Sequence, residues 1–187
     1  PGGVCFPVQY LVPLHTFGQD SQYGFVDFAA SCALKAASPS VVVHFAAQLS
    51  ALVPAGNAVL VPYPGHDPGK LSCSKCLVDE MCRLNPRFRN GARILLRTRS
   101  SAHRSRGGTR DITEQFDSLS VNLDVSEFAH CHFICIDDNM NTGSSFAVFG
   151  ELMRQAGVQS SRLSGVAVGR FGRSSELQGT GYIIRET

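Results

Sequence analysis

Apolar residues in this chain gather in short runs, separated by polar turns rich in Gly and Pro. Three of these runs are only five or six residues long and nearly all apolar, which is typical of buried parallel strands. They cover residues 58–62, 131–136 and 163–168. Elsewhere the apolar positions recur every three or four residues, which predicts helices packed on an apolar face. These helices are expected over 25–36, 40–53, 72–84 and 146–156.

The last third of the chain reads as strand, turn, helix and strand with short connections, the pattern of a right-handed βαβ unit. We therefore expect an α/β fold with a mostly parallel twisted sheet flanked by helices, in one domain over residues 1–187. Ligands should bind at the carboxyl ends of its strands. Residues 1–20 are expected to be irregular, 92–97 to be strand or helix, and 182–185 to add a strand. A polar, turn-rich stretch predicts an exposed mobile loop at 100–111.

Composition limits the class of protein further. No apolar run approaches the roughly 20 residues that span a bilayer, and the first residues show no basic, secretory-type leader. Seven Cys, an odd number, do not fit a closed disulfide framework. We therefore expect a protein of the cytoplasm with no membrane partner.

Positive charge is concentrated in one segment. Residues 83–110 contain nine Arg and no Asp, Glu or Lys, whereas the whole chain carries only +2, so the remaining residues carry −7. Such a segment favours an anionic partner, either a phosphorylated small molecule or nucleic acid.

The segment 133–145 (FICIDDNMNTGSS) carries the clearest chemistry. Two acids, Asp137 and Asp138, follow an apolar strand, and a turn with Gly and hydroxyl residues opens into a helix. Backbone N–H groups at a helix N-terminus bind phosphate, and two nearby carboxylates can hold the vicinal hydroxyls of a ribose. The pattern therefore predicts a ribose 5-phosphate site. The alternative is a plain turn at the two acids, with Ser144 capping the helix.

This segment resembles the phosphoribosyl pyrophosphate motif of type I phosphoribosyltransferases, although it differs from that motif at Asn139 and Asn141. The resemblance implies that Asp137 and Asp138 hold the ribose 2′- and 3′-hydroxyls. It also implies a 5′-phosphate site formed by Asn141, Thr142, Gly143, Ser144 and Ser145. A core over about 40–171 and a small hood from 1–30 and 172–187 are expected from the same family.

A second resemblance covers residues 58–171. The stretches 58–66 (AVLVPYPGH) and 95–116 (LLRTRSSAHRSRGGTRDITEQF) are similar in order and spacing to the competence protein F family. In that comparison His103 and Arg110 occupy positions of the family's flexible loop. The zinc ribbon usual at the N-terminus of that family is not found within residues 1–187.

These resemblances imply a Mg²⁺-dependent transferase that moves phosphoribose from phosphoribosyl pyrophosphate to a nitrogen nucleophile, a base-like heterocycle or an amine. Mg²⁺ would be held by Asp137, Asp138 and substrate oxygens. A loop at Tyr63, Pro64 and Gly65 would meet the pyrophosphate. Further contacts to the leaving pyrophosphate would come from Arg99, Arg104 and Arg110.

Three alternatives stay open. The chain could bind phosphoribosyl pyrophosphate without turnover, as a regulator or a DNA-uptake accessory protein that contacts nucleic acid through residues 83–110. It could form a homodimer, as many proteins of this fold do. Finally, Cys73, Cys76 and Cys82 with His66 could bind Zn²⁺, whereas reduced helix cysteines are the simpler interpretation.

Overall fold

A computed structural model describes residues 6–14, 32–101, 112–140, 143–171 and 182–183. Its main sheet has six strands in the order β3-β2-β6-β7-β1-β8. The first five are parallel, and β8 pairs antiparallel with β1 at one edge. These strands are β1 (Pro7–Leu14), β2 (Ala58–Pro62), β3 (Phe88–Asn90), β6 (His132–Met140), β7 (Leu163–Phe171) and β8 (Tyr182–Ile183).

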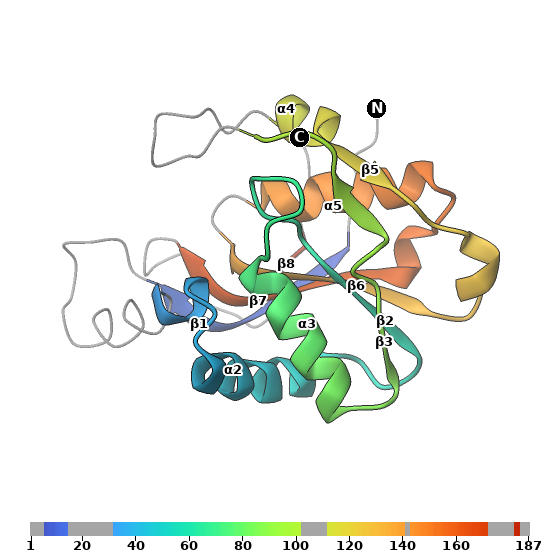
Figure 1. Cartoon of the computed structure of the whole chain (residues 1–187). Helices are drawn as coiled ribbons and strands as arrows, with labels where there is room; N and C mark the ends of the chain where they lie inside the picture. Colours follow the sequence, from blue (N-terminus) through green and yellow to red (C-terminus); the bar gives the residue numbers. More distant parts are fainter. Residues whose placement is uncertain (1–5, 15–31, 102–111, 141–142, 172–181, 184–187) are drawn as a thin grey trace.

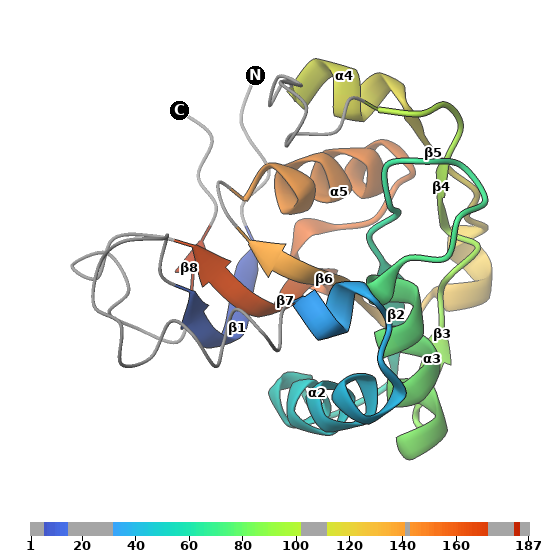
Figure 2. The same ribbon diagram turned by 60° about the vertical axis from the view of Figure 1, so that its left-hand side comes forward.

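Helices cover both faces of this sheet, which is the α/β arrangement expected from the sequence. The helices are α2 (Pro39–Leu52), α3 (Cys73–Leu84), α4 (Ile112–Asp117) and α5 (Ser144–Gln155). Helices α2 and α3 lie on one face, α5 lies on the other, and α4 lies beyond α5 (Figures 1 and 2). A two-stranded antiparallel pair, β4 (Leu95–Arg97) and β5 (Leu119–Val121), lies beside the main sheet.

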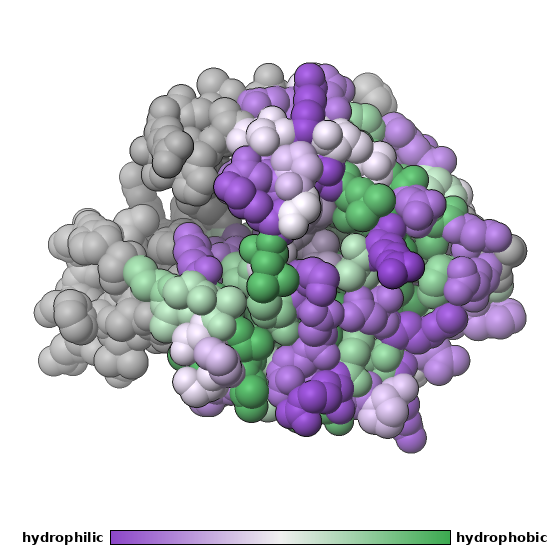
Figure 3. All heavy atoms as spheres, in the orientation of Figure 1, coloured by the Kyte–Doolittle hydropathy of each residue, from purple (hydrophilic) through white to green (hydrophobic). Residues whose placement is uncertain are grey.

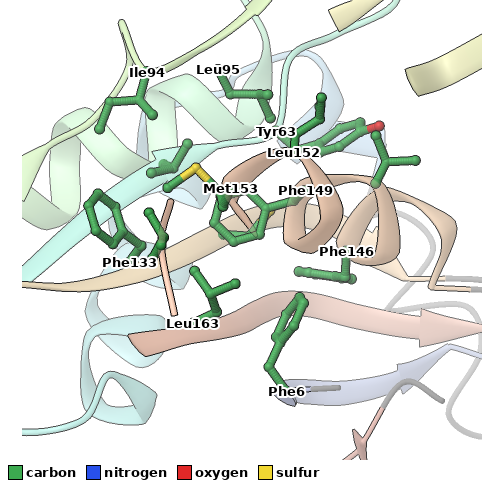
Figure 4. Close-up of a cluster of buried hydrophobic side chains, with 14 of the residues drawn as sticks. Phe6, Tyr63, Ile94, Leu95, Phe133, Phe146, Phe149, Leu152, Met153 and Leu163 are labelled. Carbon is green, nitrogen blue, oxygen red and sulfur yellow. The ribbon is translucent and has the colours of Figure 1, made fainter. Parts of the chain in front are cut away.

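Alternation along the central strands divides the core into two apolar clusters. In β6, Phe133 and Cys135 belong to the cluster under α5, whereas Ile134 and Ile136 belong to the one under α2 and α3. All four side chains are buried, and all four are apolar, as expected for a parallel strand that helices cover on both faces. Figure 4 shows the α5-side cluster, in which Phe6 packs edge-on against Phe149.

Two short 3-10 helices, η2 (Val125–Phe128) and η3 (Ser160–Arg162), flank the amino ends of β6 and β7. Arg162 joins them, because its guanidinium donates to the Phe128 carbonyl and to the Cys131 carbonyl (2.7 Å). On the opposite side of the sheet, hydrophilic side chains cover α3 (Figure 3). None of the described helices is long and apolar enough to cross a membrane.

Several elements confirm the sequence predictions. The strand at 58–62, the helix over 72–84 and the strands that begin near 131 and 163 form where expected. The 40–53 helix begins one residue earlier than predicted, with Pro39 in its first turn after Ser38 as N-cap. Residues 95–97 are strand. Of the helix expected over 25–36, the described part is helical at 32–35.

Two predictions at the sheet are wrong. Residues 7–14 form β1, a strand with β7 on one side and β8 on the other, so they belong to the sheet and not to a hood. Pro7 is the first residue of β1, and Pro13 lies beyond the two-residue pairing with β8, so both occupy positions where a sheet tolerates proline. Strand β6 also continues through Met140, because its pairing with β7 runs on to Arg170. Residues 182–183, also expected in the hood, form β8 of the same sheet, and Phe6 is buried in the core. The other residues of the expected hood lie outside the described ranges.

Candidate functional site

The carboxyl ends of β2 and β6 lie side by side, and the chain leaves them in opposite directions. From β2 it passes through α3 to β3 on one side, and from β6 through α5 to β7 on the other. In open α/β sheets ligands bind outside the strand ends at such a reversal. Pro62 is in register with Ile136, and the Tyr63 N–H donates to the Ile136 carbonyl (2.8 Å). We call these two strand ends the switch point.

The two predicted acids stand at the β6 side of the switch point, within the strand and not in a turn after it. Asp137 is 8% exposed and Asp138 is half-buried. The Asp137 carboxylate accepts the Asp138 N–H (2.9 Å) and contacts the Ser145 hydroxyl. Asp138 accepts both the backbone N–H (2.9 Å) and the side-chain amide (3.0 Å) of Asn139.

The electrostatics of this acid pair are unfavourable without a ligand. Burial first, and the neighbouring Asp138 second, raise the pKa of Asp137 well above its ordinary value. Among the described residues, no basic side chain forms an ion pair with Asp137 or Asp138. Buried carboxylates are ordinarily paired or bound to a cation, so this pair is suited to a cation or to hydroxyl donors of a ligand.

Helix α5 begins directly beyond the acids. Gly143 is its N-cap and has a positive φ of 80°, a backbone conformation that favours glycine. Ser144 and Ser145 form the first helical positions, so Ser144 is not the cap that the plain-turn alternative requires. The N–H groups of a first helical turn and the helix dipole attract anions. Asn141 and Thr142, predicted at the same site, lie outside the described residues.

The β2 side of the switch point is the loop after Pro62, and it is held by Arg97 of β4. The Arg97 guanidinium donates from Nε to the Gly65 carbonyl (2.9 Å) and from a terminal nitrogen to the Pro64 carbonyl (3.3 Å). Its other terminal nitrogen donates to the Ser118 hydroxyl (2.5 Å). The loop predicted to meet pyrophosphate therefore has a positively charged support.

Tyr63 ties this loop to α4 as well. Its hydroxyl donates to the Gln115 side-chain oxygen (2.9 Å) and also contacts the Arg97 guanidinium. Burial is the main cause that raises the pKa of Tyr63, so the phenol stays protonated at neutral pH. At the other end of the loop, the His66 carbonyl accepts the Ser101 N–H (2.9 Å), and the two side chains also meet (3.2 Å).

The three arginines predicted to contact pyrophosphate are less well placed than Arg97 or lie outside the described residues. Arg99 forms an ion pair with Asp117 (3.8 Å) with its side chain 61% exposed. His103, Arg104 and Arg110 lie outside the described residues. The two flanks of that segment are nevertheless close to the switch point, because Ser101 contacts His66 and Gln115 of α4 contacts Tyr63.

The cysteines of α3 do not gather into a metal site. Within the described ranges, which include His66, Cys73, Cys76 and Cys82, no three His, Cys, Asp or Glu side chains are arranged to hold a metal ion. Cys73, the first residue of α3, instead contacts the Asp138 carboxylate. Burial, and then the two acids, raise the pKa of the Cys73 thiol, so it remains a neutral neighbour of the acid pair.

Sequence reasoning missed three residues that shape the switch point: Arg97, Gln115 and Ser118. Arg97 belongs to the Arg-rich segment, but nothing in its local sequence separates it from the other eight. One signal was available: Arg97 lies two residues after the buried Leu95 on a short strand, and residues two apart on a strand share a face. Compared with the models of known protein families and with curated protein sequences, the chain matches none.

Proposed function

We propose that this protein is a type I phosphoribosyltransferase that uses phosphoribosyl pyrophosphate as donor and a nitrogen nucleophile as acceptor. The observation that carries this proposal is the meeting of two oppositely charged strand ends. A carboxylate pair and a helix N-terminus stand at the end of β6, and a loop held by a guanidinium stands at the adjacent end of β2. A ribose with a 5′-phosphate and a pyrophosphate presents matching groups on both sides.

In the reaction, the acceptor nitrogen forms a bond to the anomeric carbon while the bond to pyrophosphate breaks, and pyrophosphate leaves with the electron pair. Positive charge develops on the ribose and negative charge on the leaving group, so the site must position and stabilise charge. Asp137 and Asp138 would bind the ribose hydroxyls, and Gly143, Ser144 and Ser145 the 5′-phosphate. The loop at Tyr63, Pro64 and Gly65 would bind the leaving pyrophosphate.

The oxygen-rich end of β6 also fits a magnesium ion. Asp137 and Asp138 offer carboxylate oxygens, and Mg²⁺ in proteins is bound by one or two carboxylates together with substrate phosphates and water. When bound, the ion would neutralise charge on the pyrophosphate. Arg99, Arg104 and Arg110 remain candidates for the leaving group, and His103 for the loop that carries them.

Titration calorimetry of phosphoribosyl pyrophosphate with Mg²⁺ tests the proposal directly. We expect the wild-type chain to bind with a Kd of about micromolar size, and the double variant Asp137→Asn/Asp138→Asn to show no measurable binding. A matched control, Asp79→Asn/Glu151→Gln, also removes two negative charges but from outside the switch point, and should bind like wild type. A folded wild type without binding would contradict the proposal, as would a double variant that binds normally.

The alternative is a phosphoribosyl pyrophosphate-binding regulator that contacts nucleic acid through residues 83–110. The exposed side chains of Arg87 and Arg93 favour it. Against it, Arg83, Arg89 and Arg99 form ion pairs with acidic neighbours, which reduces the charge available to phosphates. Two assays on the purified protein distinguish these functions. A transferase releases pyrophosphate when an acceptor is present, whereas a regulator of this kind binds DNA with strong salt dependence.

A further inference from the structure

The guanidinium of Arg97 is half-buried, and its described hydrogen-bond partners are neutral, while the Glu114 carboxylate of α4 lies close enough to attract its charge. The described hydrogen-bond acceptors of Arg97 are two backbone carbonyls, a serine hydroxyl and a tyrosine hydroxyl. Ser118, which accepts one of these bonds, is completely buried. Burial lowers the pKa of Arg97, yet an arginine stays charged in any protein environment. A positive charge therefore lies directly behind the loop of Pro64 and Gly65.

This contact also determines which way the loop's peptide groups face. The carbonyls of Pro64 and Gly65 both point to the Arg97 guanidinium. The described peptide bonds are trans, and in a trans peptide the N–H points opposite to the C=O. The N–H groups of Gly65 and His66 must therefore point away from Arg97. Two successive N–H groups turned to one side are the arrangement that binds anions in backbone nests.

We propose that Arg97 is the positioning residue of the pyrophosphate site: it turns the loop so that the Gly65 and His66 N–H groups face the leaving pyrophosphate. The inference rests on the proposed function and adds a residue to it. Arg97 contributes in two ways, since its hydrogen bonds orient the two peptide groups and its charge makes the potential at the loop positive. It does not touch the pyrophosphate itself.

Calorimetry with two separate probes tests this role, each measured with Mg²⁺. Inorganic pyrophosphate reports on the β2 loop, and ribose 5-phosphate reports on the end of β6. We expect Arg97→Gln to weaken pyrophosphate binding at least tenfold and to change ribose 5-phosphate binding less than twofold. Arg93→Gln, at an exposed arginine of the same segment, should leave both affinities unchanged.

Arg97→Lys separates orientation from charge. An ammonium keeps the charge but lacks the planar fork that reaches two carbonyls and a hydroxyl together. We therefore expect Arg97→Lys to bind pyrophosphate nearly as weakly as Arg97→Gln. Ser118→Ala removes one acceptor without touching the charge, and a several-fold loss of pyrophosphate affinity is expected even if the Arg97 variants fold poorly.

The outcomes distinguish this inference from the proposed function. A wild type that binds neither probe nor phosphoribosyl pyrophosphate would overturn both. A wild type that binds all three, with Arg97→Gln and Ser118→Ala unchanged, would overturn the role of Arg97 alone. Equal loss of both probes in Arg97→Gln would show a general structural role and overturn it too, and full rescue by Arg97→Lys would reduce the role to charge.

Discussion

The two strand ends at the switch point are built in different ways. At the end of β6, the acids, the glycine cap and the first turn of α5 all come from one continuous segment, residues 137–145. At the end of β2, the loop depends on Arg97, Gln115 and Ser118, which lie 32 to 55 residues further along the chain than Gly65, Tyr63 and their neighbours. One side is a local motif, whereas the other is assembled by tertiary contacts.

The two ends also differ in the charge that they hold. The β6 end buries negative charge without a described cation, and the β2 end partly buries positive charge against neutral acceptors. Buried charge without a partner lowers stability, and a bound ligand of complementary charge repays that cost. Under the proposed function, a ligand that brings both a metal ion and a pyrophosphate would compensate both charges.

Two glycines allow the strongest test of this contrast, one in contact with the first turn of α5 and the other with β2. A Cβ at Gly165 would lie 2.5 Å from the Phe146 ring of α5, and a Cβ at Gly91 would lie 2.9 Å from the Leu60 carbonyl of β2. Such overpacking costs about 1–3 kcal/mol. We expect that loss of unfolding free energy for both Gly165→Ala and Gly91→Ala in urea denaturation.

The same variants should affect different ligands. Gly165→Ala displaces Phe146 in the first turn of α5 and should weaken ribose 5-phosphate binding. Gly91→Ala disturbs the segment that leads into β4 and Arg97, and should weaken pyrophosphate binding. A loss of unfolding free energy below about 0.5 kcal/mol, as is usual for surface positions, would contradict the tight packing around these two glycines. If both variants weakened the same ligand equally, the two strand ends would not act as separate subsites.

A smaller effect is expected from Asp137→Asn, which should raise the stability of the fold and weaken ligand binding. The folded-state pKa of Asp137 lies above the ordinary value of 3.8, so the folded protein retains that proton to higher pH than the unfolded chain. This carboxyl therefore favours folding at low pH, and its contribution is lost as the pH rises above 3.8 through the folded-state pKa. Asn keeps the hydrogen-bonding oxygen without the charge.

We accordingly expect Asp137→Asn to melt a few degrees higher than wild type at pH 7.5, while binding phosphoribosyl pyrophosphate more weakly. Thermal unfolding measured from pH 7.5 down to pH 4 should show the advantage shrinking as wild-type Asp137 becomes protonated. An advantage that stays constant over this range, or a variant less stable than wild type at pH 7.5, would show that Asp137 is not the buried, poorly compensated charge described above.

The smallest effect concerns Tyr63→Phe, which removes the hydroxyl between Gln115 and Arg97 but keeps the buried ring. A single hydrogen bond of this kind contributes about 1 kcal/mol, and that loss is expected in thermal unfolding. A double-mutant cycle with Gln115→Met provides the control, because the two changes should be less than additive if they remove the same contact. Strict additivity would contradict the Tyr63–Gln115 hydrogen bond.

Much of the fold could be predicted from the sequence because parallel strands and amphipathic helices leave direct patterns. The apolar run of β2 and the helical period of α3 identify these elements without tertiary information. Strand β1 escaped prediction, since its two prolines mask it and its pairing with β7 joins residues over 150 positions apart. The extension of β6 to Met140 escaped for a similar reason, because the partner strand and not the local sequence determines where pairing stops.

The candidate site divides in the same way. By itself the sequence determined the acid pair, the glycine-containing turn and the helix that follows, because these groups act through neighbours along one segment. Only the tertiary structure decided that the Tyr63–Gly65 loop lies beside the acids and that Arg97, among nine arginines, holds it. The physical reason is that strand order and side-chain contacts between distant segments depend on packing of the whole sheet, which no local pattern records.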